Sequence, residues 1–78
     1  MDTIETMNAA EATEWLRARG MKISPQMLVR GIRGGAFPFG SVIPPEKEGE
    51  APRTYVYTVL LEEWAAERIR GKKAVTQH

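Results

Sequence analysis

Gln26, Arg30 and Arg33 are side chains that can each form paired hydrogen bonds with a planar polar group. Arginine presents several N–H donors in a rigid plane, and glutamine presents a donor beside an acceptor. At about 100° per residue of helix, measured from Leu28, the three fall near about 160°, 200° and 140° respectively. They therefore share one face of a predicted helix, opposite the apolar pair Leu28 and Ile32.

The hydrogen bonds that these side chains can form match the base edges of the DNA major groove. Arginine can bond O6 and N7 of guanine, glutamine can bond N6 and N7 of adenine, and each good pair discriminates by about 1–3 kcal/mol. Ser24 precedes the helix and can offer its hydroxyl or amide to a phosphate. Met27 and Val29 border this face, where we expect both to be partly packed, and Met27 is kept as a candidate contact. Exposed arginines and glutamines are also ordinary on solvated helices, so the residues alone leave both interpretations open.

The positive charges of the chain are concentrated in one stretch. The net charge is only +1 and the pI is about 8.1, whereas the pI of DNA-binding domains usually exceeds about 9. From residue 15 to residue 45, however, the chain has no acid and five basic residues, which are Arg17, Arg19, Lys22, Arg30 and Arg33. The acids gather at the N-terminus, in "EKEGE" and in "LLEEWAAE". The acid-free stretch therefore supports the DNA-binding hypothesis more than the net charge does.

The chain has no cysteine and no histidine before its last residue, so the commonest nucleophiles, bases and metal ligands are missing. The lone histidine is that last residue, His78, where we expect a terminal tail. No phosphate-binding loop pattern is present, and Glu46, Glu48 and Glu50 lie in a predicted loop that would not hold them in a reactive geometry. We expect no enzymatic activity, no catalytic residue, no metal and no cofactor.

The chain carries no recognisable targeting or membrane-spanning signal. The start, "MDTIETM", is acidic and lacks the cationic and then apolar run of a secretory signal. The longest apolar stretch, around "YVYTVLL", is far shorter than the roughly 20 residues that span a bilayer. We expect a soluble, cytoplasmic protein.

Two short helices must position the candidate residues. Asn8 as N-cap with Glu11 three residues later, followed by a stop at Gly20, predicts a helix over about 9–19. Its inward face carries Ala9, Ala12, Trp15 and Leu16, while Glu14 and Arg17 point away. Ser24 followed by Pro25 predicts a second helix over 25–33 that ends at Gly34 and Gly35. The link between them is only "GMKIS", which makes the pair a helix-turn-helix candidate.

A hairpin is predicted after the second helix. The stretches "AFPFGSVIPP" and "RTYVYTV" are aromatic and β-branched, and "EKEGEAP" between them predicts a long loop. Pro38 and Pro44 limit the first strand to an edge or irregular role. In the second strand, Tyr55, Tyr57 and Val59 alternate onto one face, which we expect to point inward.

A third helix is predicted from "TVLLEEWAAERIRG", with Thr58 as its cap and Gly71 as its stop. Its apolar stripe comprises Leu61, Trp64, Ala65 and the stem of Arg68. The chain is then one α+β domain over 8–71 in the order helix, helix, hairpin, helix, with an N-terminal tail over 1–7 and a basic C-terminal tail over 72–78. At 78 residues it is too short for a second domain.

The string "MNAAEATEWLRARGMKISPQMLVRGIRGGAFPFGSVI", followed by "TYVYTVLLEEW", resembles the excisionase-like branch of the MerR-type winged-helix superfamily. The likeness covers roughly residues 7–70 and is most specific in "IRGGAFPFG" and "YTVLLEEW". It implies a winged helix-turn-helix with the helix over about 25–33 in the major groove and a wing over about 41–53. Lys47 and Arg53 would be the cations of that wing, contributing weakly because its tip, "EKEGE", is acidic where wings are usually basic.

The resemblance also implies partners. It suggests a sequence-specific protein of a phage or mobile element that binds double-stranded DNA, either as an excisionase or as a small transcriptional regulator. An integrase, or another copy of the protein on an adjacent site, would be its protein partner, and no small-molecule effector is expected. Two alternatives stay open: a protein–protein interaction module that uses the aromatic hairpin or acidic loop, and the DNA-recognition part of a packaging protein.

Overall fold

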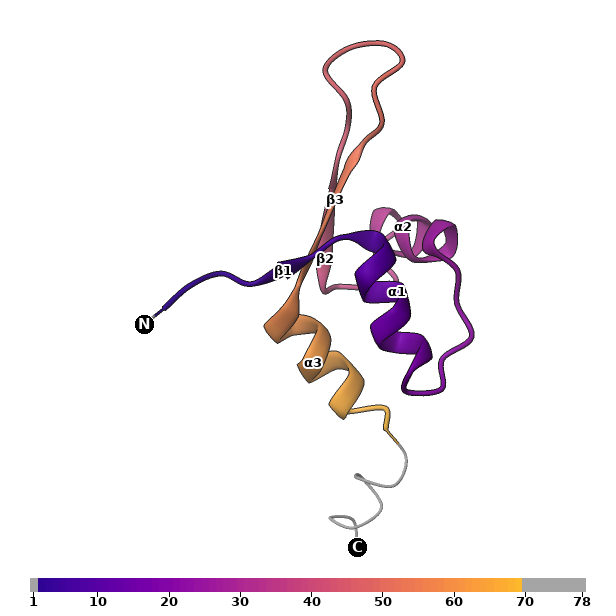
Figure 1. The fold of residues 1–78 in the computed structure, drawn as a ribbon, viewed down its shortest axis with the longest axis vertical. Helices are drawn as coiled ribbons and strands as arrows, with labels where there is room; N and C mark the ends of the chain where they lie inside the picture. The colour runs from indigo at the N-terminus through magenta and orange to yellow at the C-terminus, as the bar shows by residue number, and fades with distance from the viewer. Residues whose placement is uncertain (1, 70–78) are drawn as a thin grey trace, which may run out of the picture.

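The structure, a computed structural model that describes residues 2–69, has three helices and a three-stranded antiparallel sheet (Figure 1). The predicted α+β class is confirmed. The elements in chain order are β1 (Thr6–Met7), α1 (Ala9–Arg17), α2 (Pro25–Arg33), β2 (Gly40–Ile43), β3 (Arg53–Tyr57) and α3 (Thr58–Ala66). None of the helices within residues 2–69 combines the length and apolarity needed to cross a lipid bilayer.

The sheet has β3 at its centre, with β1 and β2 as its edges. Val56 faces Met7 of β1 on one side and Gly40 of β2 on the other. β2 is thus an edge strand, as predicted from its flanking prolines. β1 was not predicted, because residues 1–7 were interpreted as a tail. A strand of two residues is too short to show an alternation of apolar and polar side chains in the sequence, and its extended conformation depends on pairing with β3.

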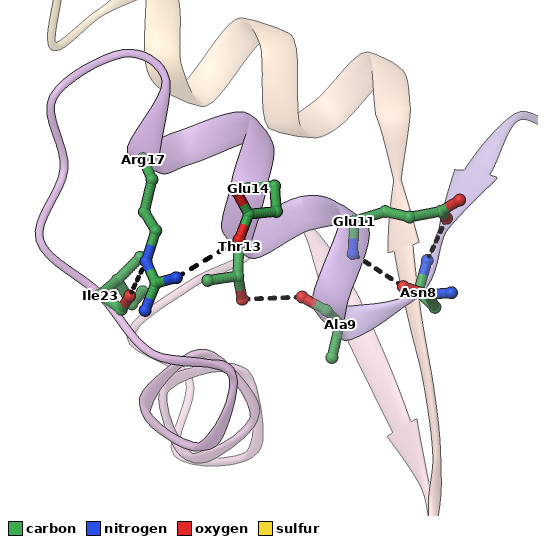
Figure 2. Close-up of polar contacts among 7 residues, drawn as sticks. All are labelled: Asn8, Ala9, Glu11, Thr13, Glu14, Arg17 and Ile23. Atoms are coloured by element: carbon green, nitrogen blue, oxygen red, sulfur yellow. Dashed lines mark hydrogen bonds and ion pairs between the residues drawn. The ribbon is translucent and has the colours of Figure 1, made fainter.

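Helix α1 begins and ends through local hydrogen bonds, and Figure 2 shows those at its start. The Glu11 N–H donates to Asn8 Oδ1 at 2.7 Å, and the Asn8 N–H donates to Glu11 Oε1 at 3.0 Å, so the predicted capping box is confirmed. At the other end, Met21 N donates to Leu16 O at 3.1 Å, and Gly20 has φ +97°. This is a Schellman closure, which ends α1 at Arg17, two residues earlier than predicted.

Helix α2 has the predicted bounds and a similar ending. Ser24 Oγ accepts a hydrogen bond from the Met27 N–H at 3.2 Å, and Pro25 occupies the first helical position. After the helix, Ala36 N donates to Gly31 O at 2.8 Å, while Gly35 has φ +86°. Glycine suits that left-handed conformation because it has no Cβ. The chain therefore reverses sharply after α2 and enters the aromatic segment directly.

The core lies where α1, α2, α3 and the sheet meet. Its fully buried side chains include Leu28 of α2, Val56 of β3, Leu61 of α3 and, between α2 and β2, Phe39. The ring of Phe39 stacks on that of Phe37 at a centroid distance of 5.3 Å. Trp64 meets both rings edge-on, at 5.6 Å from Phe37 and 5.1 Å from Phe39. This aromatic cluster joins the segment after α2 to helix α3.

The prediction for the start of α3 was wrong in one respect. Thr58 is the first helical residue and does not cap the helix with its side chain; Tyr57 occupies the cap position without a side-chain hydrogen bond. The Thr58 N–H instead donates to Glu5 O at 2.9 Å. Strand β3 runs directly into α3, so a partner outside the helix satisfies this donor. The stripe of Leu61, Trp64 and Ala65 faces inward as predicted.

The inward face of β3 was also predicted wrongly. Val56, completely buried, points into the core, whereas Tyr55 is 37% exposed and Val59 of α3 is 59% exposed. Side chains along β3 do alternate between the two faces of the sheet, but the size of the two tyrosines wrongly suggested that their face was the buried one. Tyr57 is half-buried, and its hydroxyl donates to Ser41 Oγ at 3.4 Å across the sheet. The predicted stop at Gly71, the tail over 72–78 and His78 lie outside the described residues.

Gly31, inside α2, is predicted to be required for stability. A Cβ at this position would collide with the ring of Phe37. We expect Gly31→Ala to lower the free energy of unfolding by about 1–3 kcal/mol. At an exposed position inside a helix, the same substitution would instead stabilise the protein by about 1 kcal/mol, because alanine has the higher helix propensity. Urea unfolding followed by circular dichroism would measure the change. Phe37→Leu provides the control, because the cost of Gly31→Ala should shrink in the double variant; an increase in stability from Gly31→Ala alone would contradict the prediction.

Candidate nucleic-acid interface

The outer face of α2 presents most of the sequence-predicted contacts together. Gln26, Arg30 and Arg33 are exposed, and Met27 is 54% exposed. Leu28 and Ile32, on the other side of the helix, are buried in the core. The helical period therefore placed these side chains correctly, and Met27 is less packed than expected. No acidic residue lies on α2, so its outer face carries two full positive charges.

The first turn of α2 also exposes a backbone donor. The hydroxyl and carbonyl of Ser24 accept hydrogen bonds from Met27 N and Leu28 N, and Pro25 has no N–H. Gln26 N–H is left without a partner among the described residues, at the positive end of the helix dipole. Such amides at helix starts bind phosphate or carboxylate oxygens. Ser24 is half-buried, and its hydroxyl proton can still be donated to an anion while the oxygen caps the helix.

Arg17, which the sequence placed on a solvated face, instead fixes the connection between α1 and α2 (Figure 2). Its Nε donates to Ile23 O at 2.9 Å, and a terminal nitrogen lies 3.3 Å from Glu14 Oε2. Ile23 is buried and directly precedes Ser24. Arg17 therefore holds the residue that leads into the cap of α2. A hydrogen bond from a charged donor to a carbonyl contributes more than a neutral one.

Two other arginines are held against tryptophans. The guanidinium carbon of Arg19 lies 3.6 Å from the ring centroid of Trp15, and that of Arg68 lies 4.3 Å from the ring centroid of Trp64. Each arginine also donates to the backbone carbonyl of the same tryptophan, at 3.0 Å and 2.9 Å respectively. Both pairs are spaced four residues apart on a helical turn. These cations are therefore anchored to their own elements.

The cations around α2 are not engaged in this way. Within residues 2–69, no hydrogen bond or ion pair joins the side chain of Lys22, Arg30 or Arg33 to another residue. Lys22 was not among the predicted contacts. It is exposed and lies two residues before Ser24, a position next to the helix start that the sequence alone could have indicated. Three uncompensated positive charges thus border the start and outer face of α2.

The two remaining predicted contacts lie on the hairpin and are not brought onto the face of α2. Arg53, exposed, pairs with Ile43 at the base of the hairpin loop. Lys47 lies in that loop, which projects away from the helices in Figure 1. The tip closes on itself: Glu46 N donates to Glu50 Oε1 at 3.1 Å, and Glu50 N donates to Lys47 O at 3.3 Å. The charges of the tip are predominantly negative, in contrast with α2.

Comparison with known proteins gave no relative: no protein-family model, no curated protein and no solved structure matches the chain. Within residues 2–69, no three acidic or histidine side chains are grouped so that they could hold a metal ion. The candidate interface therefore rests on its own geometry: an exposed helix face, a free helix-start amide, and cations that are unpaired within the described part of the chain.

Ser24 is predicted to stabilise α2 whether or not it contacts a ligand. We expect Ser24→Ala to lower the free energy of unfolding by about 1 kcal/mol, because the Met27 N–H loses its acceptor. Ser24→Asp is the matched variant, since aspartate also caps helices and should leave stability nearly unchanged. Thermal and urea unfolding would measure both changes. Equal losses in the two variants would show that capping is not the role of Ser24.

Proposed function

We propose that the protein binds double-stranded DNA in a sequence-specific manner, with α2 as its recognition helix in the major groove. The observation that carries this proposal is the outer face of α2, where Gln26, Arg30 and Arg33 are exposed without an acidic neighbour on the helix. Arginine and glutamine are the residue types that pair with guanine and adenine. Arg17, Arg19 and Arg68 are each engaged by a neighbouring group, whereas the two arginines of α2 are not.

In this proposal, α1 and α2 act as a helix-turn-helix and the β2–β3 hairpin acts as a wing. The first turn of a recognition helix meets base edges, which places Gln26 and Met27 closest to the bases. Ser24, the Gln26 amide and Lys22 contact phosphates beside the helix start. Arg30 lies one turn further along the same face. Arg53 and Lys47 add little, because the acids of the hairpin tip repel the phosphate backbone.

We further propose that this DNA binding serves excision or transcriptional regulation in a phage or mobile element. This follows from the resemblance of "IRGGAFPFG" and "YTVLLEEW" to excisionase-like proteins. A module with few phosphate contacts binds DNA weakly and with strong dependence on salt. An integrase, or a second copy on an adjacent site, would raise its affinity by holding it at a high local concentration. A role in DNA packaging would use the same helix face.

The proposal predicts that the cations of α2 control DNA affinity. We expect Arg30→Ala and Arg33→Ala each to weaken binding to a preferred duplex by about 1–3 kcal/mol if they bond bases. Selection from a randomised duplex pool would define the preferred site, and fluorescence anisotropy would then measure affinity. Arg19→Gln is the matched control: it removes the same charge from a residue anchored on Trp15, so affinity should change little.

The amide signals of α2 in NMR provide the result that would contradict the proposal. When duplex DNA is added at low salt to the folded protein, the amide signals of Gln26, Arg30 and Arg33 should shift. If these signals stay unchanged with every duplex tested, α2 is not a recognition helix. A loss of affinity in Arg19→Gln as large as that in Arg30→Ala would indicate nonspecific attraction to total charge.

The acidic hairpin tip provides a second test. We expect the joint substitution of Glu46→Gln and Glu48→Gln to strengthen DNA binding at low salt. It removes two negative charges that, in the proposed complex, repel the phosphate backbone of DNA. The gain should disappear at high salt, and Lys47→Ala should have a smaller effect than Arg30→Ala. Anisotropy titrations over a series of salt concentrations would measure this. Weaker binding after neutralisation would show that the tip supports the complex.

A protein–protein interaction module is the second candidate function. Its supporting observation is an apolar area at the start of α3, where Ile4, Val59 and Leu60 are 84%, 59% and 40% exposed. The three side chains line one shallow pocket, and exposed apolar side chains that gather in this way mark interaction sites. Salt-independent association with a protein, combined with no DNA binding, would favour this candidate.

A further inference from the structure

A groove runs between the end of α1 and the end of α3, away from the candidate DNA interface. Its lining includes Leu16 and Met21 from the α1 side, and Ala65 and Ile69 from the α3 side. In Figure 1 these two helix ends lie toward the end of the molecule opposite the hairpin tip. No residue of α2 lines the groove. The groove is therefore separate from the proposed recognition helix.

The groove combines an apolar floor with positive charges. Leu16 and Ala65 are buried beneath it, while Met21 and Ile69 are half-buried. The rest of the lining is Arg19, Gly20, Trp64 and Arg68, and no acidic side chain takes part in it. Arg68 forms an ion pair with Glu67, whose Oε1 lies 3.3 Å from a terminal nitrogen of the guanidinium. Glu67 is itself 67% exposed, so water screens this pair and a ligand can compete for the guanidinium.

The two arginines are held in place before any ligand arrives. Each guanidinium lies over the ring of a tryptophan four residues earlier and donates to that tryptophan's carbonyl. An arginine has five N–H donors, so each keeps free donors for a ligand. A side chain that is already fixed loses less entropy on binding. The arginines are therefore poised to accept acidic groups beside the apolar floor.

From this arrangement we propose that the groove docks a segment of a partner protein in which apolar side chains are flanked by carboxylates. The apolar side chains cover Leu16, Met21, Ala65 and Ile69, and the carboxylates bond Arg19 and Arg68. Nucleic acid satisfies only half of this surface, because phosphates would engage the arginines and leave the apolar floor in water. This binding function is distinct from the proposed DNA contact and does not depend on it.

The test is a titration with a capped hexapeptide, Glu-Glu-Leu-Leu-Glu-Glu, followed by NMR of the protein without DNA. We expect the indole signal of Trp64 and the amide signals of Met21 and Ile69 to shift, whereas those of Arg30 and Arg33 stay in place. A peptide with lysine in place of glutamate, and another with glycine in place of leucine, should each bind more weakly. Binding of the glutamate–glycine peptide as strongly as the leucine peptide would overturn the role of the apolar floor.

The matched variants separate the groove from general charge. The double substitution R19Q/R68Q should weaken peptide binding by about three- to tenfold, which corresponds to two exposed ion pairs. R30Q/R33Q removes the same charge from α2 and should leave peptide binding unchanged. R19K/R68K retains the charges and should restore most of the affinity, with equal thermal midpoints showing that all variants are folded. An unchanged affinity in R19Q/R68Q would overturn the proposal.

Two other observations would also overturn it. If the protein alone shows concentration-dependent shifts at the groove, a second copy occupies it rather than a different partner. If duplex DNA shifts the groove signals and the peptide does not, the arginines bind phosphate. In either case the DNA titration of the α2 signals remains a separate measurement, so the proposed function is judged independently.

Discussion

The contact of Phe37 with Gly31 is the constraint on which the rest of the structure depends. Because Gly31 has no side chain, the Phe37 ring can lie directly against α2 as soon as the chain has reversed at Gly35. Phe39 then enters the core, and Trp64 meets both rings from α3. One close approach thus fixes α2 relative to the sheet and to α3 and leaves the other side of the helix exposed. The geometry of the candidate interface follows from this packing.

The arginines show how one residue type takes different roles according to its neighbours one helical turn earlier. Arg19 and Arg68 each follow a tryptophan by four residues, and each lies over that ring. The residues four positions before Arg30 and Arg33 are Gln26 and Val29, which offer no aromatic face. Their guanidinium groups therefore have no ring to hold them, and the stacking energy of about 0.5–1 kcal/mol at exposed sites fixes only the other two. This division is encoded in "WLRAR" and "WAAER" and follows from helical spacing alone.

Features that depend on nearby residues could be predicted from the sequence, and features that depend on distant ones could not. The Asn8–Glu11 box, the Ser24–Pro25 start and the Gly20 stop are local, and the structure contains all three. Strand β1 exists because β3 pairs with it, and Val56 of β3 points inward because the helices pack against that face of the sheet. The exposed face of α2 could be predicted from the helical period alone, without knowing what the helix packs against. The engagement of Arg17 did need it, since the Ile23 carbonyl is oriented by the turn that follows α1.

The same Arg17 contact is one route by which the two proposed surfaces can influence each other. One side of the groove is the end of α1, and Arg17 at that end holds the Ile23 carbonyl beside Ser24. A ligand that moves the end of α1 would therefore reach the start of α2 through this bond. A single hydrogen bond to a charged group contributes about 1.5–3 kcal/mol, and exposure of the Arg17 side chain lowers that value. Coupling through this one bond cannot exceed the contribution of the bond, so by this route peptide docking would modulate DNA affinity rather than abolish it.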